Sequence, residues 1–244
     1  PGVLCVVPGP GVTNALTGLG EALLECARAH ARLAVWLRRD LPWEFAQQPT
    51  RVPLSAAAEA PLLQARAGVF SWRHLDAGTR LLQATLSTVA DAPKLIADFG
   101  AGVGHLALQA LIRWPQAHAH ALEADAQALA CLRSNARELG LQQRCQAWWW
   151  DVSEPAPAEC YDLILCNPPC HESHRAGQGF AVAHAMLRQA ARSLHPDGTL
   201  LLVANRQLPY EAVLHTAFAG VEQLRQEQGF KVVAARRPRE VGSI

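Results

Sequence analysis

Residues 94–105 read KLIADFGAGVGH, and this stretch gives the strongest indication of the fold. Its first five residues are typical of a buried apolar strand, and residues 105–113 have the pattern of a helix. Between them lies the motif D-x-G-x-G-x-G, which is not the dinucleotide motif G-x-G-x-x-G; its members are Asp98, Gly100, Gly102 and Gly104. Glycines let the backbone approach a ligand closely, and the Asp98 carboxylate suits a ligand with a cationic amino group. We predict a cofactor-binding turn, with a plain structural turn as the alternative.

The alternation of strands and helices continues after this loop. We predict strands at residues 117–123, 146–150, 161–166, 199–204, 221–226 and 231–236, and helices at 126–139, 179–194 and 210–218. This order favours a doubly wound α/β sheet, mostly parallel and of seven strands. The last two strands are separated only by a short turn at Gly229, which indicates one antiparallel member.

The first 66 residues do not follow this pattern. They are rich in Ala and Pro, with a helix predicted at residues 19–37 and prolines at 42, 49, 53 and 61 after it. We therefore predict a short N-terminal region at residues 1–66 and a main domain at residues 67–244.

The composition indicates a soluble protein with a sizeable core. Of 244 residues, 50% are hydrophobic and 18% are charged, and the formal net charge of +1 gives no field that attracts nucleic acid. A polyanion would need a local patch, for which Arg236, Arg237 and Arg239 are candidates. Seven irregularly spaced cysteines, no membrane-length apolar run and no recognisable signal peptide predict a cytoplasmic protein that does not bind membranes. The first residue is Pro1 rather than Met, which indicates a processed or truncated start.

Carboxylates follow the next two predicted strands. Glu123 ends one strand, and a carboxylate at that position binds the ribose hydroxyls in nucleotide-binding α/β folds. Asp125 suits the N-cap of the following helix. We therefore assign Glu123 to a ribose and Asp125 to the cap. Asp151 follows the third strand and belongs either at an adenine amino group or in a surface turn.

A rigid segment ends the fourth strand, in the sequence LILCNPPCHESH at residues 163–174. Two prolines end any sheet because each lacks an N–H group and has a fixed φ. Three interpretations are open: a rigid clamp for a planar substrate, a Cys170 nucleophile with His171 as its base, or a zinc site that comprises Cys166, Cys170, His171 and His174. The clamp is favoured, because the strand directs Cys166 into the sheet and residues adjacent in sequence rarely face each other.

The order of these motifs resembles that of class I S-adenosylmethionine-dependent methyltransferases, with the glycine motif, Glu123, Asp151 and Asn167-Pro168-Pro169 at successive strand ends. The resemblance implies a Rossmann-like methyltransferase sheet and S-adenosyl-L-methionine as the cofactor. It places Asn167, Pro168 and Pro169 at the reaction and Asn167 also at the cofactor. In these enzymes the Asn-Pro-Pro group with an aromatic fourth residue marks methylation of a nitrogen that is conjugated to a planar system.

Further segments resemble the bacterial rRNA guanine-N2 methyltransferases of the RsmC/RlmG group. These are GVFS at residues 68–71, LDAGTRLL at 75–82, VANRQLPY at 203–210 and the strand that starts at residue 230. The resemblance implies methylation of guanine N2, with ribosomal RNA or the ribosomal subunit as the partner. It places Asp76 and Gly78 at the cofactor and Phe70 and Tyr210 at the substrate. Residues 1–66 would be a reduced form of the leading methyltransferase-like domain of that group.

One position departs from this group. Its members have an aromatic residue after Asn-Pro-Pro that stacks on the flipped base, and this chain has Cys170. Cysteine has no π face, so base binding is weaker unless His171, Phe180 or Tyr210 supplies a ring. Cys170 and His171 remain candidates for substrate binding.

The clamp interpretation gives the Asn-Pro-Pro segment a chemical role. The side-chain oxygen of Asn167 and the carbonyl of Pro168 are expected to accept hydrogen bonds from the two hydrogens of an amine and to aim its lone pair. Adenine N6 and a glutamine side-chain amide are alternative acceptors. A non-catalytic relative that binds RNA or protein is the alternative from another functional class.

Overall fold

The structure is a computed structural model, and it describes residues 2–8, 24–28, 31–37, 49–88, 92–158, 160–169 and 178–239. The chain divides into two compact units, Pro1–Gln47 and Gln48–Ile244. The first unit contains an antiparallel sheet with the strand order β1-β3-β2. Its strands are β1 (Gly2–Pro8), β2 (Leu24–Arg28) and β3 (Ala31–Leu37).

The helix that we predicted at residues 19–37 is therefore wrong. Two strands of the first unit occupy the described parts of this range. Within β3, Leu33, Val35 and Leu37 recur with a period of two, which is the period of a strand. Helix propensity is a weak preference, and strand pairing on both sides of β3 outweighs it here.

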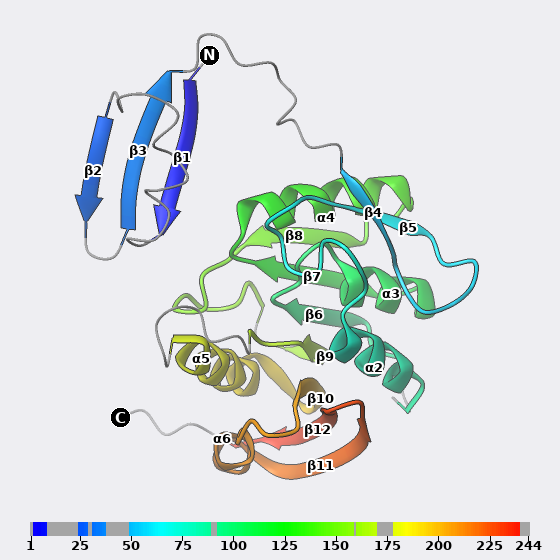
Figure 1. The fold of residues 1–244 in the computed structure, drawn as a ribbon. Coiled ribbons are helices and arrows are strands. Elements are labelled where there is room, and N and C mark those ends of the chain that lie inside the picture. Colours follow the sequence, from blue (N-terminus) through cyan, green and yellow to red (C-terminus); the bar gives the residue numbers. More distant parts are fainter. Residues whose placement is uncertain are drawn as a thin grey trace. The chain divides into compact units, whose positions relative to one another are not determined.

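The second unit is built on a seven-stranded sheet in the order β11-β12-β10-β9-β6-β7-β8 (Figure 1). Strands β6, β7, β8, β9 and β10 pair in parallel, whereas β12 is antiparallel to both β10 and β11. This confirms the predicted mostly parallel sheet and its antiparallel member. The strands are β6 (Leu95–Phe99), β7 (His118–Glu123), β8 (Cys145–Trp149), β9 (Tyr161–Cys166), β10 (Leu194–Asn205), β11 (Phe218–Glu227) and β12 (Phe230–Pro238).

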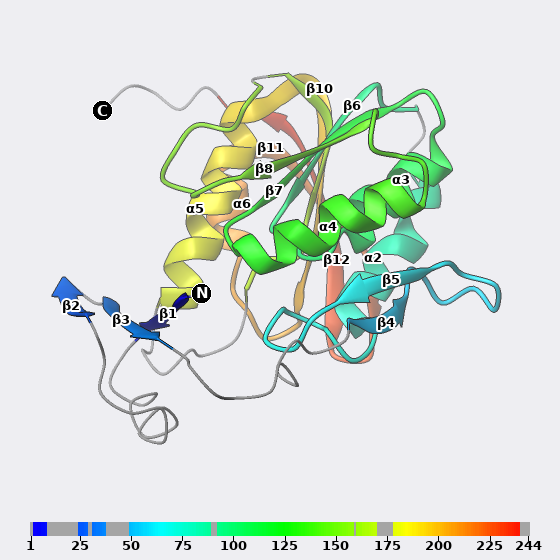
Figure 2. The same cartoon turned by 90° about the horizontal axis from the view of Figure 1, so that it is seen from above.

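Helices cover both faces of this sheet, so the unit has three layers (Figure 2). One face carries α2 (Ala77–Thr85) with a short 3-10 turn (Leu86–Thr88), α3 (His105–Arg113) and α4 (Ala126–Glu138). The other face carries α5 (Gln178–Ser193) and α6 (Glu211–Ala217). The predicted helices after the glycine motif are confirmed to within two residues at each end, and α2 is an addition.

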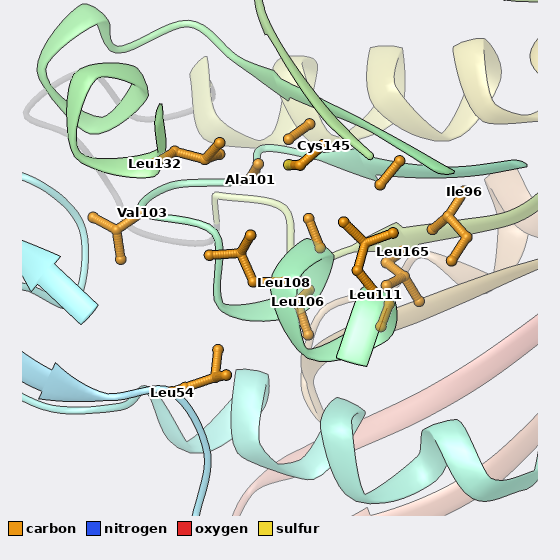
Figure 3. Close-up of a cluster of buried hydrophobic side chains, with 14 of the residues drawn as sticks. Leu54, Ile96, Ala101, Val103, Leu106, Leu108, Leu111, Leu132, Cys145 and Leu165 are labelled. Atoms are coloured by element: carbon orange, nitrogen blue, oxygen red, sulfur yellow. The ribbon is translucent and has the colours of Figure 1, made fainter. Parts of the chain in front are cut away.

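The core lies between these layers. On the α3 side, Leu108 and Leu111 pack with Ile96 of β6 and Leu165 of β9, and all four side chains are fully buried (Figure 3). A second cluster packs on the α5 side and contains Phe99, Tyr161 and Phe218. Full burial of one such side chain contributes about 1.5–3 kcal/mol. The two clusters fix the sheet from both faces and hold its carboxyl edge in place.

A hairpin of β4 (Thr50–Pro53) and β5 (Leu62–Ala65) belongs to the second unit, ahead of the boundary that we predicted at residue 67. A buried residue of α4, Asn135, attaches it. Its Nδ2 donates to the Gln64 carbonyl at 3.0 Å and to the Val103 carbonyl at 2.9 Å, and its Oδ1 accepts from the Gln64 N–H at 2.7 Å. Asn135 therefore ties the hairpin to the loop that follows β6.

Two further features bear on the sequence predictions. In the part of the chain that the structure describes, no helix has the length and apolar character needed to span a membrane.

Four cysteines in that part are free thiols, of which Cys131, Cys145 and Cys166 are buried and Cys160 is exposed.

Candidate functional site

A cavity of about 390 Å³ lies at the carboxyl ends of the parallel strands. Ligands of open α/β sheets bind at this edge. Its lining brings together nine residues singled out from the sequence: Phe70, Asp76, Gly100, Gly102, Glu123, Asp151, Asn167, Pro168 and Pro169. It also includes apolar residues that the sequence patterns did not indicate: Leu122, Ala124, Trp150, Val152, Val182, Met186 and Phe230.

The glycine loop forms the middle of the cavity wall. The φ angles of Gly100, Gly102 and Gly104 are +77°, +55° and +101°, a region that side chains disfavour. The Gly100 N–H donates to the Leu122 carbonyl at 2.9 Å, which attaches the loop to β7. Gly104 lies outside the cavity, and a Cβ there would come within 2.9 Å of Leu108 Cδ1. Gly104 therefore serves the packing of α3, while Gly100 and Gly102 face the cavity.

Glu123 is held in place by the glycine loop and by the start of α4. Its Oε2 accepts from the Gly102 N–H at 2.7 Å, and its Oε1 accepts from the Asp125 N–H at 2.8 Å. Each carboxylate oxygen can accept a second hydrogen bond, so the group keeps capacity for hydroxyl donors in the cavity. Asp125 caps α4 through the Gln127 and Ala128 N–H groups, as predicted.

The structure does not bring Asp98 to the cavity. Its carboxylate is fully buried, and its Oδ2 accepts from the Ala107 N–H of α3 at 2.9 Å. Among the described residues, its Oδ1 has no hydrogen-bond partner. The pKa of Asp98 is raised to about 7, chiefly because burial disfavours the charged form; the Ala107 bond opposes this rise, and the charge of Glu123 adds to it. Asp98 therefore supports α3 behind the loop, because its side chain faces the helix rather than the strand end.

The structure shows the surface turn that the sequence left open for Asp151, whereas its contact with an adenine amino group stays a prediction. Asp151 lines the cavity, and its Oδ1 accepts from the Ser153 N–H at 2.8 Å and the Ser153 hydroxyl at 2.7 Å, which builds a surface turn. These bonds lower the pKa of Asp151. The preceding residue, Trp150, is buried, lines the cavity and contacts the Phe99 ring at a centroid distance of 4.9 Å.

Asn167 is fixed by α2. Its Nδ2 donates to Asp76 Oδ2 at 3.0 Å and to Thr79 Oγ1 at 2.9 Å. An amide nitrogen carries two hydrogens, so both are engaged and Oδ1 is the group that Asn167 keeps for a ligand. Pro168 is buried and Pro169 exposed, and both line the cavity. The sequence patterns did not indicate Thr79, whose hydroxyl is 88 positions from Asn167.

Gly78 supports this arrangement without lining the cavity. Asp76 caps α2 through the Thr79 N–H at 2.7 Å. A Cβ at Gly78 would lie 3.0 Å from Phe230 Cδ1 and 3.1 Å from Asp76 Oδ2. The absence of a side chain therefore lets the Phe230 ring, which lines the cavity, approach the cap.

The candidate substrate residues divide into three cases. Phe70 lines the cavity and is 50% exposed. Tyr210 is buried in a ring cluster with Phe180 and His184, at centroid distances of 5.8 Å and 6.0 Å, and does not line the cavity. Cys170 and His171 lie outside the described residues. The same holds for His174, which the zinc hypothesis also included.

Cys166, a member of the zinc hypothesis, is buried at the end of β9, and burial raises the pKa of its thiol.

The predicted arginine patch lies away from the cavity. Strand β12 runs from Phe230 at the cavity to Pro238, so the patch lies towards the opposite end of this strand. There Arg236 pairs with Glu222 at 3.1 Å, and Arg239 donates to the Phe218 carbonyl. These arginines are therefore engaged with β11, away from the cavity.

The strand order and the cavity define the Rossmann-like methyltransferase class. A solved structure with this fold is the T. thermophilus 16S rRNA N2 methyltransferase RsmC, in complex with AdoMet and guanosine. It superposes with a TM-score of 0.72 over 97% of this chain and 64% of that chain, at 23% sequence identity. This similarity confirms the predicted fold class.

The model of the methyltransferase small domain family matches residues 62–234, and the chain belongs to this family. It is 31% identical to the ribosomal RNA large subunit methyltransferase G of Pseudomonas fluorescens, over 90% of this chain and 57% of the relative. It is also 31% identical to the ribosomal RNA small subunit methyltransferase C of Chromohalobacter salexigens, over 94% of this chain and 67% of the relative. The resemblance seen in the sequence is thus confirmed, although the chain spans about half the length of several relatives.

Proposed function

We propose that this chain transfers a methyl group from S-adenosyl-L-methionine to N2 of guanine in ribosomal RNA. The proposal rests on one observation: a single cavity joins Glu123 and the glycine loop to Asn167 and Pro168. Glu123 ends β7 on one side of β6, and Asn167 follows β9 on the other side. The names of the relatives support an rRNA substrate, and guanosine in the T. thermophilus RsmC complex supports the base.

The lining of the cavity fits this cofactor. Two backbone donors orient the Glu123 carboxylate, which suits it to accept the hydroxyls of a ribose. Leu122, Trp150 and Val152 supply apolar and aromatic surface for a purine, and Asp151 supplies an acceptor beside them. Gly100 and Gly102 let the backbone approach the remainder of the ligand. S-adenosyl-L-methionine supplies an electrophilic methyl group when it is bound.

The Asn-Pro-Pro segment is suited to activating an amine. The lone pair of an exocyclic amine is delocalised into its ring, so the amine reacts only when its hydrogens are held in a tetrahedral geometry. We assign the two hydrogens to Asn167 Oδ1 and the Pro168 carbonyl, since the Nδ2 bonds hold the Asn167 amide and the proline ring restricts the backbone. Acceptors that are held in place before the reaction stabilise the charge that develops on the amine.

Phe70 provides the ring that position 170 lacks. It lines the cavity together with Asn167 and both prolines, while half of its surface is exposed. Taking a base out of its stack in RNA costs a few kcal/mol of free energy, and stacking of that base on an aromatic side chain recovers about 1–3 kcal/mol. We propose Phe70 as the stacking partner, in preference to Phe180 and Tyr210, which lie outside the cavity lining.

Transfer from tritiated cofactor into ribosomal subunits, followed by separation of RNA from protein and by nucleoside analysis of the RNA, tests this function. We expect the label in N2-methylguanosine with the intact chain and little label with Asn167→Ala. Label in N6-methyladenosine would show that adenine, not guanine, is the acceptor. Label in a ribosomal protein would indicate the glutamine amide. Cofactor binding by calorimetry without any transfer would show a non-catalytic relative.

A further inference from the structure

The orientation of the Asn167 amide is a separate problem from its location. The oxygen and nitrogen ends of a side-chain amide are almost equal in size, so shape alone does not choose between two orientations. Only one of them presents an acceptor to an amine. In the other, an N–H group would face the N–H groups of the substrate. The hydrogen-bond partners of Asn167 therefore decide whether the proposed clamp exists.

Both partners of Asn167 lie at the start of α2. Thr79 Oγ1 and Asp76 Oδ2 accept its two amide hydrogens at 2.9 Å and 3.0 Å. A carboxylate oxygen only accepts, so an amide oxygen facing Asp76 would be repelled. Thr79 engages the second hydrogen and stops the amide from swinging about the first bond.

The partners are themselves fixed. Asp76 Oδ2 also accepts from the Thr79 N–H at 2.7 Å as the N-cap of α2, so it cannot turn away without uncapping the helix. Thr79 is 5% exposed and lies in the first turn of that helix. Behind them the Phe230 ring fills the space that Gly78 leaves.

We propose that Thr79, together with Asp76, is a positioning residue that holds the Asn167 amide with its oxygen towards the substrate amine. This inference rests on the proposed function and adds to it, because it explains how an uncharged side chain presents only its acceptor. Thr79 touches neither reacting group in this account. It acts through Asn167.

Thr79→Val tests the inference, since valine keeps the shape and removes only the hydroxyl. We expect kcat to fall about tenfold, the effect of one lost hydrogen bond, with KM for RNA and the cofactor Kd within about twofold. Thr79→Ser restores the hydroxyl and should restore kcat. The matched control is Thr85→Val in the same helix, where a buried hydroxyl donates to the Leu81 carbonyl. That variant should keep kcat.

A second readout does not depend on turnover. In 15N-labelled protein, the Asn167 side-chain amide hydrogens should exchange slowly with solvent, and Thr79→Val should speed this exchange about five- to tenfold. Unchanged exchange, or an unchanged kcat in Thr79→Val, would overturn the inference. If the intact chain transfers no methyl group while exchange still depends on Thr79, the proposed function fails and the positioning of the amide stands.

Discussion

The two ends of the cavity are built in different ways. At the glycine-loop end, formed by Gly100, Gly102 and Glu123, the bond that fixes Glu123 joins residues 21 positions apart. At the Asn-Pro-Pro end, formed by Asn167 with Asp76 and Thr79, the bonds join residues 91 and 88 positions apart. The first end is assembled within one strand-helix-strand unit. The second exists only once α2 has packed beside β10 and β12.

This difference matches a division of tasks. The glycine-loop end offers a fixed carboxylate and open backbone, which are suited to holding a cofactor. In the proposed function, the Asn-Pro-Pro end offers acceptors that are aimed before the reaction, which are suited to an amine as it changes geometry. Interactions made only in the transition state raise kcat, whereas those made equally with the ground state affect affinity. The two ends should therefore respond differently to substitution.

The largest expected effect is at the Asn-Pro-Pro end. Asn167→Ala removes one oriented acceptor, a loss of the same kind as removing an oxyanion-hole donor, so we expect kcat to fall roughly a hundredfold or more. Cofactor affinity should change little. Single-turnover rates at saturating cofactor, with calorimetry on the same preparation, measure both quantities. A full rate in Asn167→Ala would refute the clamp.

At the glycine-loop end, Glu123→Ala should weaken cofactor binding by more than about tenfold. The ribose hydroxyls lose a charged acceptor, and each such hydrogen bond is worth about 1.5–3 kcal/mol. Glu123→Gln keeps the size of the side chain and one acceptor, so its loss should be smaller. Calorimetry with S-adenosylhomocysteine gives both constants, and an unchanged affinity in Glu123→Ala would place the ribose elsewhere.

The sequence separation of the bonded residues also decides how well each end could be predicted from the sequence. Glu123 and the glycines lie in a local pattern whose physical meaning is specific, so their meeting at one edge could be predicted. The rigid prolines indicated Asn167, but no local pattern relates it to Thr79. Asp98 shows the limit of the pattern itself: its place at the strand end was correct, while its side chain turns to Ala107. In β2 and β3, pairing between strands overrode local helix propensity.

A smaller effect is expected at Phe70, on the substrate side of the Asn-Pro-Pro end. Phe70→Leu keeps apolar area and loses the ring face, so KM for RNA should rise about fivefold, near the lower limit of stacking energies. Phe70→Trp should keep KM close to that of the intact chain. Steady-state assays with ribosomal RNA decide this. A normal KM in Phe70→Leu would mean that another ring stacks on the base.

A further prediction concerns stability rather than catalysis or binding, at Asp98 behind the glycine-loop end. Its pKa rises from 3.8 to about 7 on folding, chiefly through burial, so the folded state binds more protons between these values. Its contribution to stability is complete below pH about 4 and is lost as the pH rises towards 7. Asp98→Asn does not titrate and should remove this loss.

The measurement is thermal unfolding of both proteins across this pH range. His105 has a pKa lowered to about 4 by burial and gives the opposite slope, but it is present in both proteins and cancels in the difference. The stability of the intact chain relative to Asp98→Asn should therefore fall as the pH rises. A constant difference would show that folding does not raise the pKa of Asp98.

The most direct test of the division between the two ends is the double variant Glu123→Ala/Asn167→Ala. Its cofactor Kd and its single-turnover rate at saturating cofactor are measured beside those of the two single variants. If the ends are independent, its Kd equals that of Glu123→Ala and its saturated rate equals that of Asn167→Ala. The account is contradicted if Asn167→Ala alone weakens cofactor binding tenfold, about 1.4 kcal/mol, or if Glu123→Ala lowers the saturated rate as far as Asn167→Ala does.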